Sequence, residues 1–136
     1  MKYSFPSEQW LEAYLAEINK SESYRKSAVT WEGDFYFIVE QGPGVPKPLI
    51  MYLDLWHGEA RSGCVVADQS ERSPEFIISA TLDVWRKVIE RKLDPIQGMV
   101  TKKLKVTGTL SKIMRYTKAA VELVNCATKV PTEFPS

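Results

Sequence analysis

The sequence predicts an α+β fold in which helices gather beside a mostly antiparallel sheet. Helix-type apolar spacing occurs near the N-terminus and again in the C-terminal third, while β-branched and aromatic residues dominate the segment between them. The expected order is helix, three or four strands, helix, strand, helix, which is typical of the α+β class. The 136 residues match the usual size of one domain and contain no repeat or linker, so we expect a single domain over 1–136.

The first expected element is a helix over residues 7–27. Ser7 is a suitable N-cap, and Trp10, Tyr14 and Ile18 recur at the spacing of one apolar helix face. The segment 19–27 is polar, which predicts that the helix breaks or frays there.

Strands are expected between residues 29 and 81. Segments 29–31 and 35–39 hold β-branched and aromatic residues, and residues 32–34 between them predict a tight turn or a bulge. The other expected features are a Pro- and Gly-rich loop at 41–46, a strand at 49–56, a hairpin turn or bulge at 57–59, and strands at 64–66 and 76–80.

The C-terminal third predicts helices around one short strand. Thr81 is placed to cap a helix that runs through Lys92, and Asp94-Pro95 starts a helical turn. A strand at 104–107 precedes a long helix from Ser111 to Cys126. The apolar stripe of this last helix is wider than one packing contact requires, which indicates a second surface, a partner or a ligand cavity.

Motifs for catalysis and metal binding are absent from the sequence. His57 is the only histidine and has no nucleophile motif beside it. Cys64, His57 and Asp54 are close in sequence but lack the spacing of a zinc site. Cys64 and Cys126 lie far apart, and we expect buried thiols at both positions. The sequence therefore predicts a protein that is not an enzyme and has no metal site or cofactor.

Positive charge is concentrated between Arg86 and Lys118, where ten Lys or Arg and two acidic residues give +8 in a chain of net charge +1. A solvated surface and a contact with an anionic membrane both fit this segment. We expect no nucleic-acid partner, because only Tyr116 offers local base stacking and the whole chain is near neutral. The sequence contains no run of about 20 apolar residues and no secretory signal, which predicts a cytoplasmic location.

Residues 93–110 resemble the C-terminal signature of the sterol carrier protein family, the non-specific lipid transfer domains. The match consists of the turn Leu93-Asp94-Pro95, the strand Lys103-Leu104-Lys105-Val106, and Gly108, in that order and spacing. Two positions depart from the family pattern: Lys102 stands where glycine is common, and Thr109 where an acidic residue or Asn is frequent.

This resemblance implies a five-stranded sheet covered on one side by helices, with an apolar cavity between the sheet and the C-terminal helix. It also implies a hydrophobic tunnel for a sterol, fatty acid, fatty acyl-CoA or phospholipid, and no catalysis by the domain itself. Burial of an apolar chain gains about 0.8 kcal/mol per CH₂, so such a site needs few specific residues. We therefore expect lipid binding, with transfer as a further possibility.

The alternatives are an interaction module or an accessory domain of a larger enzyme, with side chains filling the cavity; the first would form a homodimer. For the lipid carrier, we expect Lys112, Arg115 and Lys118 to contact an anionic head group or membrane. The expected cavity wall consists of Trp85, Ile89, Ile96, Met99, Val100, Val106, Ile113, Met114, Thr117, Val121 and Val124.

Overall fold

A five-stranded mixed sheet forms the centre of the computed structural model, which describes residues 1–135. The strand order is β4-β3-β2-β5-β6, and only the central β2–β5 pair is parallel. The strands are β2 (Glu32–Val39), β3 (Leu49–Trp56), β4 (Glu59–Val66), β5 (Phe76–Ala80) and β6 (Lys105–Thr107). The α+β class and the five-stranded sheet are therefore confirmed.

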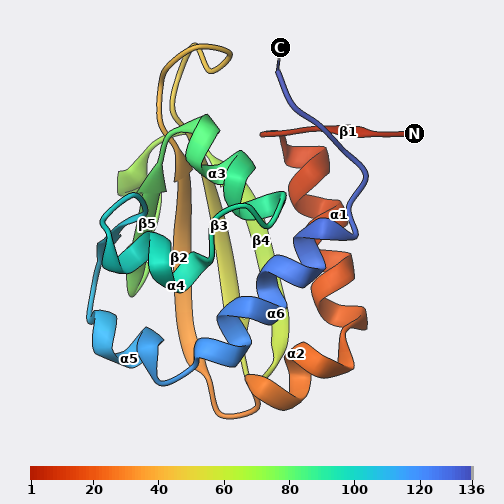
Figure 1. Cartoon of the computed structure of the whole chain (residues 1–136), viewed down its shortest axis with the longest axis vertical. Coiled ribbons are helices and arrows are strands. Elements are labelled where there is room, and N and C mark those ends of the chain that lie inside the picture. Colours follow the sequence, from red (N-terminus) through yellow and green to blue (C-terminus); the bar gives the residue numbers. More distant parts are fainter. Residues whose placement is uncertain (136) are drawn as a thin grey trace.

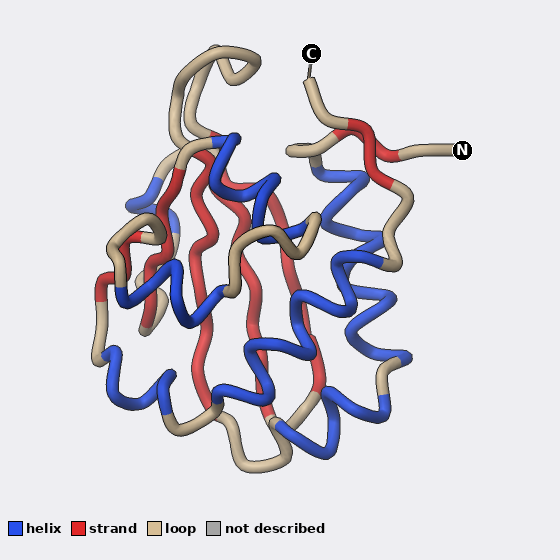
Figure 2. The backbone as a smooth tube through the Cα atoms, viewed as in Figure 1, coloured by secondary structure: helices blue, strands red, loops and turns tan. Residues whose placement is uncertain are grey.

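The α-helices cover one face of this sheet (Figure 1). They are α1 (Glu8–Lys20), α2 (Glu22–Ser27), α3 (Leu82–Ile89), α4 (Pro95–Val100), α5 (Leu110–Met114) and α6 (Thr117–Thr128). Helix α6 crosses the sheet beside α1, although about a hundred residues separate them in sequence (Figure 2). The face of the sheet beneath these helices carries most of the hydrophobic core.

Local capping accounts for the first two helices. The Ser7 side chain accepts a hydrogen bond from the Trp10 amide and starts α1. Ser21 ends α1, and its side chain accepts from the Tyr24 amide to start α2. The predicted break within 19–27 is therefore confirmed and lies at Ser21.

Asp94 and Pro95 start α4 as predicted, because the Asp94 carboxylate accepts from the amides of Ile96 and Gln97. The preceding helix was expected to continue through Lys92, but α3 ends at Ile89. Its continuation is broken at Arg91, where φ is +62° and the backbone lies in the left-handed region.

Two further predictions about elements were wrong, and a third was confirmed but too short. Residues 29–31 form a turn, and residues 32–34 belong to the regular strand β2, paired with residues 54–56 of β3. The expected hairpin turn at 57–59 is confirmed as a two-residue His57-Gly58 turn with positive φ at both residues. The expected strand at 64–66 is confirmed as the end of β4, which is longer than predicted. The expected helix from Ser111 to Cys126 is interrupted at Arg115 and Tyr116, which separate α5 from α6.

The outer face of the sheet carries a smaller cluster of five buried residues: Tyr36, Ile38, Ile50, Tyr52 and Val66. No α-helix of the described chain covers this face (Figure 1). The segment after β4 packs here instead, because the Tyr36 hydroxyl donates to the carbonyl oxygens of Gln69 and Arg72 and accepts from the Arg72 amide. The Arg72 guanidinium also lies 4.4 Å from the centre of the Tyr52 ring.

Two very short strands, β1 (Tyr3–Ser4) and β7 (Thr132–Glu133), pair in parallel at one end of the molecule (Figure 1). They bring the two ends of the described chain together. Neither strand was predicted, since two residues are too few to give a periodic pattern.

Candidate functional site

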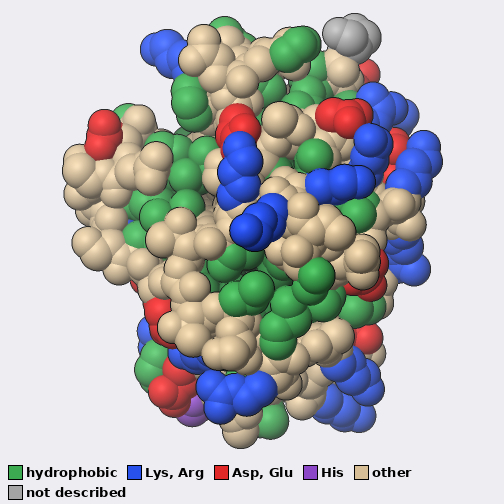
Figure 3. Space-filling model, turned by 60° about the vertical axis from the view of Figure 1, so that its left-hand side comes forward, with side chains coloured by type: hydrophobic (Ala, Val, Ile, Leu, Met, Phe, Trp, Pro, Cys, Tyr) green, Lys and Arg blue, Asp and Glu red, His purple; other side chains and the backbone are tan. Residues whose placement is uncertain are grey.

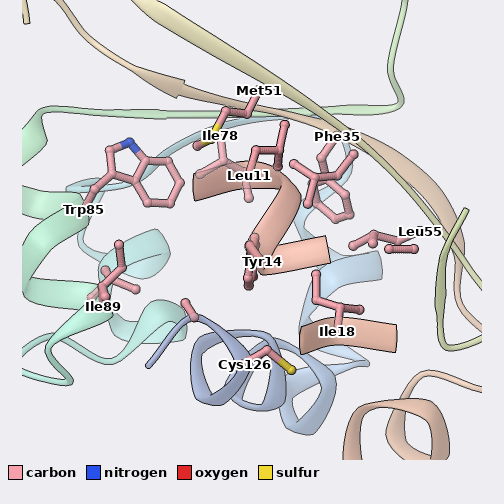
Figure 4. Packing of buried hydrophobic residues seen from close by; sticks show 14 of the residues in the cluster. Leu11, Tyr14, Ile18, Phe35, Met51, Leu55, Ile78, Trp85, Ile89 and Cys126 are labelled. Atoms are coloured by element: carbon pink, nitrogen blue, oxygen red, sulfur yellow. The ribbon is translucent and has the colours of Figure 1, made fainter. Parts of the chain in front are cut away.

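An apolar cavity of about 90 Å³, the main cavity, lies between the inner face of the sheet and the helices. Phe35, Ile78, Trp85 and Ile89 point toward this interior (Figure 4). The complete lining is Phe5, Trp10, Tyr14, Phe35, Phe37, Met51, Ile78, Trp85, Val88, Ile89, Pro95, Met99, Leu104, Ile113, Ala120, Leu123, Val124 and Ala127.

The polar atoms of the aromatic side chains in this lining are all engaged with protein partners. The Trp10 indole N–H donates to Thr132 Oγ1 at 2.9 Å, and the Trp85 indole N–H donates to the Ile38 carbonyl oxygen at 2.9 Å. The Tyr14 hydroxyl donates to the Leu123 carbonyl oxygen at 3.0 Å. The main cavity therefore offers a ligand apolar contact rather than hydrogen bonds.

Titratable groups next to the main cavity are held in their neutral forms. Burial raises the pKa of Tyr14 well above its ordinary value, with a smaller effect from the neighbouring Cys126. Burial likewise raises the pKa of the Cys126 thiol. A protonated thiol is a poor nucleophile, so Cys126 is suited to packing rather than to covalent chemistry.

The size of the main cavity limits what it can hold without rearrangement. An engineered cavity of about 150 Å³ in another protein binds benzene, whereas this cavity measures about 90 Å³. A long acyl chain needs much more space than benzene does. Such a ligand can enter only if the walls of the cavity move apart.

A second cavity of about 30 Å³ adjoins the first on the side of α2 and the α5–α6 connection. The two cavities share four wall residues: Phe35, Ile113, Ala120 and Leu123. Its other lining residues are Tyr24, Trp31, Leu55, Tyr116 and Ala119. Movement of the shared side chains would join the two spaces.

The structure brings five of the predicted wall residues together around the main cavity: Trp85, Ile89, Met99, Ile113 and Val124. The N-terminal half and β5 supply wall residues that sequence reasoning missed: Phe5, Trp10, Tyr14, Phe35, Phe37, Met51 and Ile78. Helical spacing in α1 and strand composition in β2 did indicate that Tyr14 and Phe35 are buried. Neither pattern distinguishes a residue packed in the core from one bordering a cavity.

The structure places the other six predicted residues away from the main cavity: Ile96, Val100, Val106, Met114, Thr117 and Val121. Val100 is 58% exposed and Val121 is 36% exposed. Successive helical residues are about 100° apart, so Val121 is turned away from its cavity-lining neighbour Ala120. Val106 and Met114 are half-buried and pack against the core from outside the cavity wall.

The predicted cationic residues lie around the α5–α6 connection. Arg115 and Lys118 are exposed and form no ion pair with any other residue of 1–135. Lys112 is engaged, because its ammonium group donates to the Glu32 carbonyl oxygen at 2.6 Å and to the Glu75 carboxylate at 2.8 Å. On the side where α4 and α5 lie, apolar side chains are visible between Lys and Arg (Figure 3).

Other chemical groups do not assemble into a site within residues 1–135. That range contains no group of three or more His, Cys, Asp or Glu placed to hold a metal ion. His57 lies in the exposed β3–β4 turn, where its ring meets the Glu32 carboxylate at 2.6 Å. Both cysteines are free thiols, Cys64 half-buried and Cys126 buried. None of the helices formed by these residues combines the length and hydrophobicity that a membrane crossing requires.

Comparison with known proteins supports the fold and identifies the family. A structure titled sterol carrier protein 2 superimposes with a TM-score of 0.84 and 38% identity, covering 91% of this chain and 97% of that one. A conserved hypothetical protein from Thermus thermophilus gives a TM-score of 0.84 and 36% identity, covering 93% of this chain and 90% of its own.

At 17% identity, the sec-alkyl sulfatase PisA1 shares only the fold, with a TM-score of 0.51 over 68% of this chain and 13% of the enzyme. A search of curated proteins gives no significant match. Residues 9–121 match the SCP-2 sterol transfer family, and the chain therefore belongs to that family.

Proposed function

We propose that this protein binds a lipid with a long apolar chain in the main cavity and carries it between sites. The observation that supports this most directly is the apolar lining, in which the indole and hydroxyl groups already have protein partners. Transfer of each CH₂ from water into such an interior gains about 0.8 kcal/mol, so affinity needs no catalytic or charged group. Membership of the SCP-2 sterol transfer family supports the same function.

The lipid enters by displacing the helical wall. Ile113, Ala120 and Leu123, which lie on α5 and α6, separate the main cavity from the second one. No side-chain hydrogen bond caps the N-terminus of either helix. These two helices are therefore the part of the wall best suited to move.

Arg115 and Lys118 are proposed to contact an anionic membrane surface or head group during loading. Both side chains are exposed near the α5–α6 connection, and each basic residue near an anionic surface contributes about 1 kcal/mol. Lys112 would have to leave the Glu75 carboxylate to take part.

An accessory domain is the second candidate function, since the same fold occupies 13% of the larger alkylsulfatase chain. Copurification of a catalytic partner would support it. A cytoplasmic location and a non-catalytic role remain predictions, and homodimer formation is an expectation that sedimentation can test.

Val124→Trp and Val121→Trp form a matched pair that tests lipid binding in the main cavity. Val124 lines the cavity and Val121 lies about one turn earlier on the exposed side of α6. We expect Val124→Trp to fill the cavity and reduce uptake of palmitic acid at least tenfold, about 1.4 kcal/mol, while Val121→Trp binds normally. Native mass spectrometry measures the bound fraction, and circular dichroism checks that both variants fold. Equal uptake by both would contradict the proposed location.

A further inference from the structure

Tyr24 is a buried polar residue that the apolar cavity does not explain. Its side chain is only 1% exposed and lines the second cavity, yet its hydroxyl makes no hydrogen bond with any of residues 1–135. Every fully enclosed side-chain nitrogen or oxygen of those residues has a partner. The Tyr24 hydroxyl therefore keeps a small accessible surface, and the space that Tyr24 borders is the second cavity.

Fully enclosed polar side-chain atoms in proteins usually have a hydrogen-bond partner, and those of residues 1–135 all do. The Tyr24 hydroxyl differs from them because it combines a small accessible surface with the lack of a protein partner, which leaves it able to bond to a ligand. Tyr14 provides the contrast within the same molecule, since its hydroxyl reaches the main cavity wall and donates to the Leu123 carbonyl oxygen. The tyrosine hydroxyl at the main cavity thus has a protein partner, whereas the tyrosine hydroxyl of the residue that lines the second cavity has none among residues 1–135.

The rim of the second cavity is also more polar than the main cavity. Tyr116 lines it, and the Tyr116 hydroxyl is 3.0 Å from Thr30 Oγ1 at the surface. The Lys112 ammonium group lies 4.9 Å from the centre of the Trp31 ring, which forms another part of the lining. Hydroxyl groups and the Lys112–Glu75 ion pair therefore lie around the second cavity.

We propose that the second cavity binds the polar end of a single-chain amphiphile, with the Tyr24 hydroxyl donating a hydrogen bond to a head-group oxygen while the chain occupies the main cavity. This inference rests on the proposed lipid-binding function and adds an orientation and a ligand class to it. The class is an unbranched chain that ends in a carboxyl or hydroxyl group.

The geometry allows this orientation. A volume of about 30 Å³ holds one water molecule or one head-group oxygen. The head group and the chain would be joined across the wall formed by Phe35, Ile113, Ala120 and Leu123. These four side chains are apolar, so a methylene chain can pass between them without a loss of hydrogen bonds.

Tyr24→Phe tests the role of the hydroxyl with three probes. Diphenylhexatriene is a fluorescent hydrocarbon with no oxygen to accept a hydrogen bond from Tyr24, and palmitic acid and 1-hexadecanol compete with it. We expect the variant to bind palmitic acid about tenfold more weakly and diphenylhexatriene normally, since a hydrogen bond to a charged group contributes about that factor. Tyr52→Phe, which removes a hydroxyl from the outer face of the sheet, is the matched control and should change neither.

The outcomes separate this inference from the proposed function. Weaker binding of both palmitic acid and hexadecanol supports recognition of any head-group oxygen, and weaker binding of palmitic acid alone supports recognition of a carboxylate. Normal palmitic acid binding by Tyr24→Phe, or equal weakening for all three probes, overturns the inference and leaves lipid binding intact. Failure of the unmodified protein to bind any probe overturns both.

A measurement on the unmodified protein keeps the inference testable if the variant folds poorly. With palmitic acid labelled with ¹³C at C2, we expect nuclear Overhauser contacts between that methylene and the Tyr24 ring. Contacts from C2 to Trp85 and Ile89, at the far wall of the main cavity, would overturn the orientation. Thermal unfolding of ligand-free Tyr24→Phe should match or exceed that of the unmodified protein, because no internal hydrogen bond is lost.

Discussion

The two faces of the sheet are both apolar, but they are closed in different ways. Helices cover the inner face and leave a cavity of about 90 Å³, whereas the outer face buries five residues beneath the segment that follows β4. On the outer face both tyrosine hydroxyls form hydrogen bonds. Tyr36 bonds to Gln69 and Arg72, and Tyr52 donates to the Asp34 carboxylate at 2.8 Å. The second oxygen of Asp34 accepts from the Glu75 amide at 2.7 Å.

The two modes of closure indicate which wall of the cavity can adapt. Hydrogen bonds across β2, β3 and the segment 69–75 hold the outer face, so the sheet behaves as a fixed wall. The helices meet the inner face mainly through apolar contacts, which tolerate sliding better than directional hydrogen bonds do. A ligand larger than the cavity should therefore displace helices rather than strands.

Replacement of Tyr36, which bonds the outer face to the segment after β4, should change the protein most. Tyr36→Ala deletes a ring that is 1% exposed together with its three hydrogen bonds, and we expect a loss of about 3–5 kcal/mol in the free energy of unfolding. Urea unfolding measures the loss. Tyr36→Phe keeps the ring and should lose about 1–3 kcal/mol. If the alanine variant lost less than about 1 kcal/mol, the outer face would not be the fixed wall.

Two buried isoleucines, one on each face of the sheet, should respond differently to replacement. Ile78 lines the main cavity and Ile50 belongs to the outer cluster, and both are at most 5% exposed. Replacement by Ala should lower the free energy of unfolding by about 2–5 kcal/mol in each case. Only Ile78→Ala enlarges the main cavity, so it alone should bind diphenylhexatriene more tightly in a fluorescence titration. The same gain in affinity in Ile50→Ala would contradict the difference between the two faces.

The smallest effect concerns alkaline pH. Burial and the hydrogen bond to Asp34 raise the pKa of Tyr52 from 10.0 to about 12. The folded protein then retains a proton that the unfolded chain loses, so this contribution to stability is complete below about pH 10 and disappears as the pH rises through about 12. Tyr52→Phe should therefore show a shallower loss of stability over that range, as measured by urea unfolding at several pH values. An unchanged pH profile would contradict the role assigned to Asp34.

Sequence reasoning succeeded where the signal was local. Ser7 and Asp94 cap helices through side-chain contacts within three residues, and the alternation from Phe76 to Ala80 corresponds to a single strand. It failed where the backbone departs from a regular pattern: the helix expected to run to Cys126 is interrupted at Tyr116, although the apolar spacing continues across that point.

The candidate site was harder to predict than the fold. Val124 and Val121 both belong to the apolar stripe of the last helix, but only Val124 borders the main cavity. Tyr14 and Phe35 were expected to be buried, yet nothing in the sequence distinguishes a packed side chain from one beside an empty space. Tyr24 lies in the polar segment 19–27, where no apolar periodicity pointed to the interior.

The pairing of β1 with β7 has a practical consequence for experiments on this protein. Both ends of the described chain emerge at one pole of the molecule, and the α5–α6 connection lies at the opposite pole (Figure 1). An affinity tag, a surface tether or a fusion partner attached at either end would therefore project away from Tyr116 and the second cavity. Immobilisation through either end should leave the α5–α6 connection facing the solution.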